Sequence, residues 1–222
     1  MKDVIGILGL GRRSTDYYIE LLQDKYYKIH GDYHTFPFLM YQIDFNTINP
    51  YLPNQFAKLI PVSEKLITEL KKLPTQKWLI PNITFHETFD KLETKVSIFH
   101  PIQLCLTFCK VNKIKELVVF GTDYTMKSEY LKGNFERENI FVGKVDLEDL
   151  QFINLFRKKV YQNSESIKDV DSYLSLIKKY SNKYHVVIAC TELSLIHKNN
   201  NSNKIIDLAH LQINEALNYT NK

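Results

Sequence analysis

The stretch HVVIACTEL, residues 185–193, decides the fold of this chain. Its first part, His185–Ala189, is apolar and rich in β-branched residues, which predicts a short buried strand. The stretch then reaches a thiol, Cys190, followed directly by the polar side chains of Thr191 and Glu192. In a parallel α/β sheet, ligands bind where the strands end. The stretch therefore predicts a parallel strand that brings a cysteine to a candidate site.

Short apolar strands alternate with longer amphipathic helices along the rest of the chain. The expected strands are Val4–Leu10, Phe38–Ile43, Lys77–Ile80, Glu116–Phe120, Ile140–Val142 and His185–Ala189. The expected helices are Thr15–Lys25, Asn54–Leu73, Phe85–Glu93, Ile102–Asn112, Thr125–Asn134, Leu147–Gln162, Ser166–Ser181 and Ala209–Leu217. This alternation favours a parallel α/β architecture. The best internal boundary lies near His100, where one strand–helix series ends and another begins.

Composition and charge exclude several classes of protein. With 222 residues, 44% hydrophobic and 24% charged, the chain is long enough to bury one substantial core or two small ones. The net charge of +4 is modest and the lysines are scattered, so no nucleic acid is expected as a partner. No apolar run approaches the roughly 18 residues of a membrane span, and the start lacks a signal-peptide pattern. We therefore expect no membrane association.

The three cysteines are an odd number, which disfavours a disulfide framework and fits a reducing, cytoplasmic location. Cys105 and Cys109 are four residues apart and would share one helix face. They could form half of a metal site, but no second Cys or His pair has a matching spacing. We interpret them as small buried residues on an apolar stripe and expect no metal.

Four expected strand-to-helix junctions carry hydroxyl side chains. They contain Ser14 with Thr15, Thr84, Thr122 with Thr125, and Thr191 with Ser194. The spacing of Thr84 and Glu87 also fits a capping box. Free amides at helix starts and nearby hydroxyls suit an anion such as a carboxylate. The alternative is that each hydroxyl simply caps its own helix. Four such junctions, one of them with a thiol, favour a ligand site.

A glycine-containing turn, GLGRRS at residues 9–14, follows the first expected strand. It is a poor dinucleotide fingerprint, because Ser14 stands where the third glycine belongs and no acidic residue follows at the usual distance. Arg12 and Arg13 place positive charge beside the expected pocket.

Five segments, in order along the chain, resemble motifs of the aspartate/glutamate racemase family. The segments are Gly9–Gly11 with the following Ser14, NITFH at 82–86, GTDYTM at 121–126, CTEL at 190–193, and Asp207 with His210. The family usually has Cys-Asn-Thr-x-His in its first half and Cys-Thr-Glu-Leu in its second. In this chain the second thiol is present as Cys190, whereas Asn82 stands at the place of the first. The resemblance covers nearly the whole chain.

The resemblance implies an α/β fold of two pseudo-symmetric three-layer lobes with parallel sheets and a cleft between them. One lobe would contain residues 1–99 plus 208–222, and the other residues 100–207. The family often dimerises, so a homodimer is compatible with this chain.

The resemblance also implies a racemase that needs no cofactor and acts on a small carboxylate or amino acid. One thiolate removes the α-proton and the opposite thiol delivers a proton to the other face. Cys190 would be the remaining acid/base, with its pKa lowered by the start of a helix. Asn82 cannot ionise near neutral pH, so it can neither remove nor deliver that proton directly.

Further roles follow from the same resemblance. The residues expected to bind the substrate are Gly11, Ser14, Thr84, Thr122, Thr125, Met126 and Thr191. His86, Glu192 and His210 are expected to organise the site rather than to perform chemistry. The cations that usually bind the substrate are missing: no Arg occurs at 49–56, and Phe152 stands where a Lys is frequent. Arg12 or Arg13 could compensate.

Three functions remain open at this point. The first is a racemase-like isomerase acting on the carbon next to a carboxylate. The second is one-sided proton chemistry such as decarboxylation, because arylmalonate decarboxylase, a more distant relative, keeps only the second-half cysteine. The third is a catalytically degenerate paralogue that binds a carboxylate.

Overall fold

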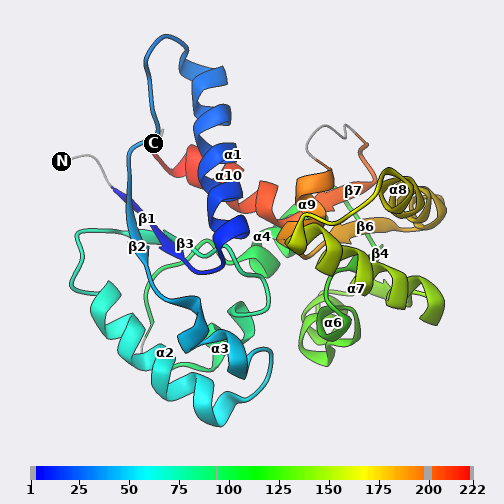
Figure 1. The fold of residues 1–222 in the computed structure, drawn as a ribbon, viewed down its shortest axis with the longest axis horizontal. Coiled ribbons are helices and arrows are strands. Elements are labelled where there is room, and N and C mark those ends of the chain that lie inside the picture. Colours follow the sequence, from blue (N-terminus) through cyan, green and yellow to red (C-terminus); the bar gives the residue numbers. More distant parts are fainter. Residues whose placement is uncertain (1–3, 94, 198–201, 221–222) are drawn as a thin grey trace. The chain divides into compact units, whose positions relative to one another are not determined.

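The structure, a computed structural model, describes residues 4–93, 95–197 and 202–220. It forms two compact units, one of Met1–His100 with Gln212–Lys222 and one of Pro101–Leu211. Each unit has its own parallel sheet flanked by helices (Figure 1). The predicted α/β class with parallel sheets is therefore confirmed.

The first unit is built on three parallel strands in the order β2 (Phe38–Gln42), β1 (Ile5–Gly9), β3 (Lys77–Leu79). Helices α2 (Phe56–Leu70) and α3 (His86–Lys91) share a core with Leu8 and Trp78. Gly6 is required in β1, because any Cβ there would overlap the Trp78 ring. Two short 3₁₀ turns, Phe45–Thr47 and Asn49–Tyr51, connect β2 to α2.

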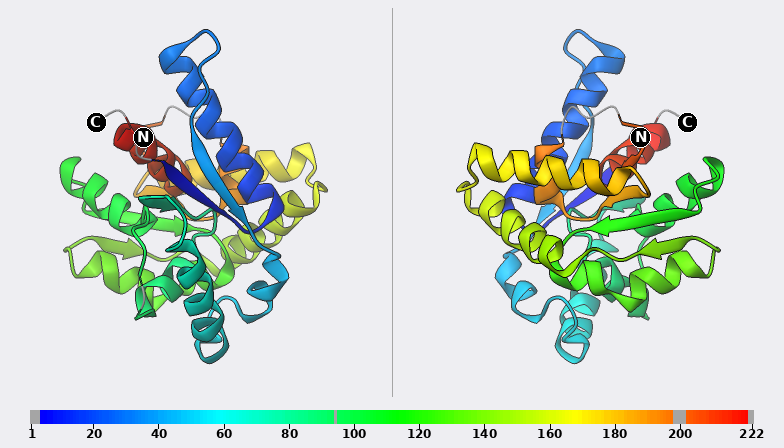
Figure 2. Two further views of the ribbon diagram at one scale, coloured as in Figure 1. Left: turned by 90° about the vertical axis from the view of Figure 1, so that its left-hand side faces the viewer. Right: turned by 90° about the vertical axis from the view of Figure 1, so that its right-hand side faces the viewer.

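Two long helices contribute to the first unit, the second of them only from Gln212 onward. They are α1 (Arg12–His30) and α10 (Leu208–Thr220), and α1 extends well past the strands of its own sheet (Figure 2). The Tyr18 hydroxyl hydrogen-bonds to the Gln212 carbonyl oxygen, and the Gln212 amide donates to the backbone oxygen of Phe99. These buried bonds join α1, α10 and the end of the segment after α3.

The second unit contains four parallel strands in the order β5 (Phe141–Gly143), β4 (Glu116–Phe120), β6 (His185–Ile188), β7 (Ile205–Asp207). Its other elements are the helices α4 (Pro101–Val111), α5 (Asp123–Lys127), α6 (Glu129–Glu136), α7 (Leu147–Gln162), α8 (Ile167–Ser181) and α9 (Thr191–Ile196). One core joins strand residues such as Phe120 and Ile188 to Phe156 of α7 and Tyr173 of α8. No described helix is both long and apolar enough to cross a membrane.

Two expectations about secondary structure are wrong for local reasons. The expected helix Thr125–Asn134 is two helices, because the backbone of Ser128 is extended and its side chain accepts a hydrogen bond from the Leu131 N–H, which starts α6. Strand β7 was not expected. It has only three residues, and its pairing with β6 rather than a local pattern makes it a strand.

Candidate functional site

The ends of β4 and β6 lie side by side in the second unit. Phe120 is in register with Ile188, and the Ala189 N–H donates to the Phe120 carbonyl oxygen at 2.8 Å. A Cβ at Gly121 would lie 3.1 Å from the Ala189 carbonyl oxygen, so the two turns touch. The turn after β4 and Cys190 are thereby held together at the carboxyl edge of the sheet.

Cys190 precedes α9 and is buried, with 6% of its surface exposed. Its thiol donates a hydrogen bond to the Glu192 carboxylate at 2.8 Å. Burial, and then the charge of Glu192, raise the pKa of Cys190 well above its usual value, while the charge of Arg157 acts in the opposite direction. The pKa lowering expected from the start of a helix is therefore wrong for this structure, and the thiol is protonated at neutral pH.

Thr122 and Thr125 organise the turn between β4 and α5. The Thr122 hydroxyl accepts a hydrogen bond from the Thr125 N–H at 3.0 Å, and the two hydroxyl oxygens are 2.7 Å apart. The Met126 N–H donates to the Thr122 carbonyl oxygen, and the half-buried Met126 side chain packs against the core of the unit. Capping accounts for the Thr122 hydroxyl, which is the alternative considered for each junction.

Two residues of α7 that the sequence analysis missed are linked to this turn, Asn154 directly and Arg157 through Asn154. The Asn154 side-chain oxygen accepts from the Asp123 N–H at 3.1 Å and from Arg157 Nε–H at 3.0 Å. Both residues are half-buried beside the buried stripe of α7 that includes Ile153 and Phe156. A polar pair three residues apart at the margin of an apolar stripe is the signal that could have found them.

A polar cluster lies behind Cys190. One carboxylate oxygen of Asp207 accepts from the Ser194 hydroxyl at 3.0 Å and from the His210 N–H at 3.3 Å. Burial and then the charges of Asp207 and Cys190 raise the pKa of Tyr173 well above its usual value. Thr191 is buried at the first position of α9. Asp207 thus links the start of α10 to α9. The part of His210 in this link is its backbone N–H, which donates to Asp207.

In the first unit, Asn82 follows the end of β3 and holds its own turn. Its side-chain oxygen accepts from the Phe85 N–H at 3.0 Å, and its backbone oxygen accepts from His86 Nδ1 at 2.8 Å. The expected capping box of Thr84 and Glu87 is wrong, because α3 begins at His86 and its N-cap has no side-chain hydrogen bond. Asn82 supplies the oxygen that Thr84 was expected to supply.

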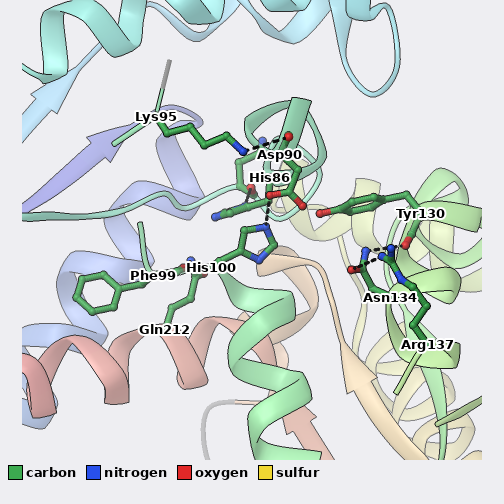
Figure 3. Close-up of polar contacts among 10 residues, drawn as sticks. His86, Asp90, Lys95, Phe99, His100, Tyr130, Asn134, Arg137 and Gln212 are labelled. Atoms are coloured by element: carbon green, nitrogen blue, oxygen red, sulfur yellow. Dashed lines mark hydrogen bonds and ion pairs between the residues drawn. The ribbon is translucent and has the colours of Figure 1, made fainter. Parts of the chain in front are cut away.

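His86 is a buried, neutral side chain. Burial is the largest cause that lowers its pKa to about 3, and the neighbouring His100 adds to the shift. Because Nδ1 donates to Asn82, Nε2 is unprotonated, and it is buried without a hydrogen-bond partner among the described residues. His100 Nε2 lies 3.4 Å from the Asp90 carboxylate (Figure 3). Near neutral pH, His86 therefore supports the turn as an uncharged ring whose one N–H proton is on Nδ1.

The turn between β1 and α1 contains the other predicted residues of the first unit. The Ser14 hydroxyl donates to the Gly11 carbonyl oxygen at 2.9 Å, and Thr15 accepts from the Leu10 N–H at 3.1 Å. Both hydroxyls therefore bond to the backbone of their own turn, and neither caps α1. Arg12 is exposed, whereas Arg13 is half-buried, with Nη1 buried and without a partner among the described residues.

The predicted residues thus fall into two groups. In the first unit, Gly11 and Ser14 follow β1, and Asn82 and Thr84 follow the adjacent β3. In the second unit the group at the ends of β4 and β6 consists of Thr122, Thr125, Met126, Cys190, Thr191 and Glu192. Within residues 4–93, 95–197 and 202–220, no three His, Cys, Asp or Glu side chains are arranged to hold a metal ion.

No protein-family model and no curated protein sequence matches the chain. Solved structures match it over its full length. A provisionally assigned Asp/Glu racemase from Yersinia pestis has a TM-score of 0.83 at 20% identity, covering 99% of this chain and all of the other. An aspartate racemase homologue from Pyrococcus horikoshii OT3 has a TM-score of 0.81 at 18% sequence identity, and the match covers both chains completely. The aspartate racemase of Picrophilus torridus has a TM-score of 0.74 at 18% sequence identity, and the match covers all of this chain and 95% of the other. This chain has the fold of the Asp/Glu racemases.

Proposed function

We propose that this protein is a racemase-like isomerase that needs no cofactor and moves a proton at the carbon next to a carboxylate, with Cys190 as its acid/base. The observation that carries the proposal is the buried Cys190 thiol, hydrogen-bonded to Glu192 at the carboxyl edge of the sheet. A thiol at this edge suits proton transfer to carbon, and the fold is one in which racemases occur.

The local chemistry supports a carbon acid as substrate. Removing an α-proton places negative charge on the adjacent carboxylate, and fixed donors stabilise that charge. Thr122 and Thr125 form a hydroxyl pair in the turn that touches the turn of Cys190, and Arg157 adds a positive charge that acts on the thiol. Glu192 accepts a hydrogen bond from the protonated thiol in the resting state, so a carboxylate lies in position to take the proton when a thiolate forms.

One-sided proton chemistry is the second candidate, and two observations favour it. The raised pKa keeps Cys190 protonated, which is the state of a proton donor. Asn82 has its side-chain oxygen bonded to the backbone of its own turn, and an amide cannot ionise near neutral pH. A substrate whose carbanion forms by loss of carbon dioxide would need only the proton that Cys190 delivers. A site that only binds a carboxylate is the third candidate.

Proton NMR in heavy water with a panel of amino acids separates these functions. The proposal predicts that the α-proton signal of at least one amino acid disappears with the intact protein and persists with Cys190→Ala. Cys109→Ala is the matched control, because it also removes a buried thiol from the second unit. If no member of the panel exchanges, the isomerase proposal is wrong. Release of carbon dioxide from a substituted malonate, dependent on Cys190, would then establish the second candidate.

A further inference from the structure

Arg157 is a half-buried cation that forms no ion pair within the described parts of the chain. The neighbouring acid Asp123 pairs instead with Lys127 at 2.8 Å. A guanidinium stays protonated in proteins, and a partly desolvated charge without a partner costs free energy. A bound anion would offset that cost.

The position of Arg157 is fixed by the helix that carries it. Helix α7 packs against α5 and α9, which follow β4 and β6. Arg157 Nε–H donates to Asn154, whose side-chain oxygen also accepts from the Asp123 N–H. The guanidinium is thereby tied to the turn after β4. With Nε–H used, the four N–H groups on Nη1 and Nη2 remain for a ligand.

Cys190 lies within the electrostatic reach of the same guanidinium. Arg157 is the cation that opposes the effect of burial on the thiol. The turn after β4 and the turn after β6 also touch, as the close approach of Gly121 to Ala189 demonstrates. Arg157 and Cys190 are therefore both associated with the carboxyl edge of the second unit's sheet.

We propose that Nη1 and Nη2 of Arg157 bind a carboxylate of the small molecule whose proton Cys190 transfers. Two N–H groups at the end of a guanidinium match the two oxygens of a carboxylate. Arg157 would supply the cation that is absent at position 152, where the Phe152 ring stacks on Phe156 at 6.0 Å. The identity of the transferred proton rests on the proposed function, whereas the carboxylate site does not depend on turnover.

Competition between two alkylating reagents tests this site. Iodoacetate and iodoacetamide react with the same thiolate but differ in a carboxylate, so the ratio of their rates at Cys190 reports carboxylate binding. A change in thiol pKa affects both rates equally and cancels in the ratio. We expect Arg157→Gln to lower the iodoacetate-to-iodoacetamide ratio about tenfold, the loss expected for one charge-assisted contact. Arg157→Lys keeps the positive charge but lacks the paired N–H groups of a guanidinium, so its rate ratio should lie between those of the wild type and Arg157→Gln.

Arg137→Gln is the matched control. Arg137 also bonds to an asparagine three residues earlier, with Nη2 donating to the Asn134 side-chain oxygen at 2.9 Å, but it is exposed (Figure 3). The ratio should not change in this variant. Mass spectrometry of the Cys190 peptide gives both rates, and labelling of the buried Cys105 and Cys109 would reveal unfolding. If Arg157→Gln unfolds, Arg157→Lys decides.

An unchanged ratio in a folded Arg157 variant would overturn the carboxylate site. This failure is distinguishable from failure of the proposed function. If the ratio falls as expected but no amino acid exchanges its α-proton, the carboxylate site stands and the reaction is wrong. If exchange occurs but the ratio is unaffected, the reaction stands without this site.

Discussion

Asn82 and Cys190 each follow a parallel strand within three residues, yet their side chains are used differently. The Asn82 oxygen accepts from a backbone N–H of its own turn. The Cys190 thiol has no capping bond and directs its proton to a carboxylate. The residue behind Asn82 is a neutral histidine, whereas those around Cys190 are the charged Glu192 and Arg157. The two turns are alike in the fold and differ in chemistry, because the residue at the end of the strand is an amide in the first unit and an ionisable thiol in the second.

The largest effect should separate Cys190→Ala from Asn82→Ala in the α-proton exchange assay. Removing a general acid/base costs 10²–10⁴-fold in rate as an order of magnitude, and we expect a loss of about this size for Cys190→Ala. Asn82→Ala should change the rate by no more than about threefold, because Asn82 supports a turn. NMR exchange rates measure both. Similar losses in the two variants would contradict the difference between the turns.

His86 should make the first unit sensitive to acid. Its pKa is about 3 in the folded protein and near 6.5 in the unfolded chain, so below pH 6.5 only the unfolded chain takes up the proton. Stability from this group is complete above pH 6.5 and is lost as the pH falls. Between pH 6.5 and 4.5 the loss is about 2–3 kcal/mol.

Urea unfolding at the two pH values measures this loss. His86→Phe should lose less stability than the wild type over the same interval, by about 2–3 kcal/mol. His34→Phe removes an exposed histidine of the same unit and should keep the wild-type dependence. Parallel pH profiles for wild type and His86→Phe would show that His86 does not stay neutral.

Glu192→Gln should make Cys190 more reactive. The charge of Glu192 and its hydrogen bond both raise the pKa of the thiol, and glutamine carries no charge. The lower pKa of the thiol would increase the rate of iodoacetamide alkylation at pH 8, because more of Cys190 would be present as the reactive thiolate. Glu148→Gln, at an exposed position of the same unit, is the control. No increase would mean that burial alone sets the reactivity of Cys190.

The smallest effect concerns the turn of Asn82. Removing a side chain that caps a turn costs about 1 kcal/mol, so Asn82→Ala should lower the free energy of unfolding by about that amount. Asn82→Asp keeps an oxygen acceptor and should cost less. Chemical denaturation compares the two variants, and equal losses would show that the bond to the Phe85 N–H is unimportant.

The sequence predicted elements whose pattern is local. The apolar run of β6 and the amphipathic helix α7 agree closely with the structure, because each is long enough to show its own period. The three-residue strand β7 has no such period and exists through its pairing. The break at Ser128 depends on one capping bond inside a favourable helical pattern.

Within the candidate site, the sequence predicted where residues lie in the fold better than it predicted the pKa of the thiol. Cys190 and Thr122 were placed at strand ends by motif and pattern. The raised pKa of Cys190 comes from burial, which a helix start of six residues does not overcome. Asn154 reaches the turn, and Arg157 is linked to it through Asn154, only because α7 packs against α5. Such contacts are formed by tertiary structure and leave little trace in local spacing.

The most direct test of the difference between Asn82 and Cys190 is the initial rate of solvent deuterium incorporation into each enantiomer of the substrate, measured separately. A single thiolate removes the proton only from the face that it approaches. The account predicts that one enantiomer exchanges at least about tenfold faster than the other, and that Asn82→Ala preserves this preference. Equal rates for the two enantiomers, with one of them lost in Asn82→Ala, would contradict it and make Asn82 part of the proton pathway.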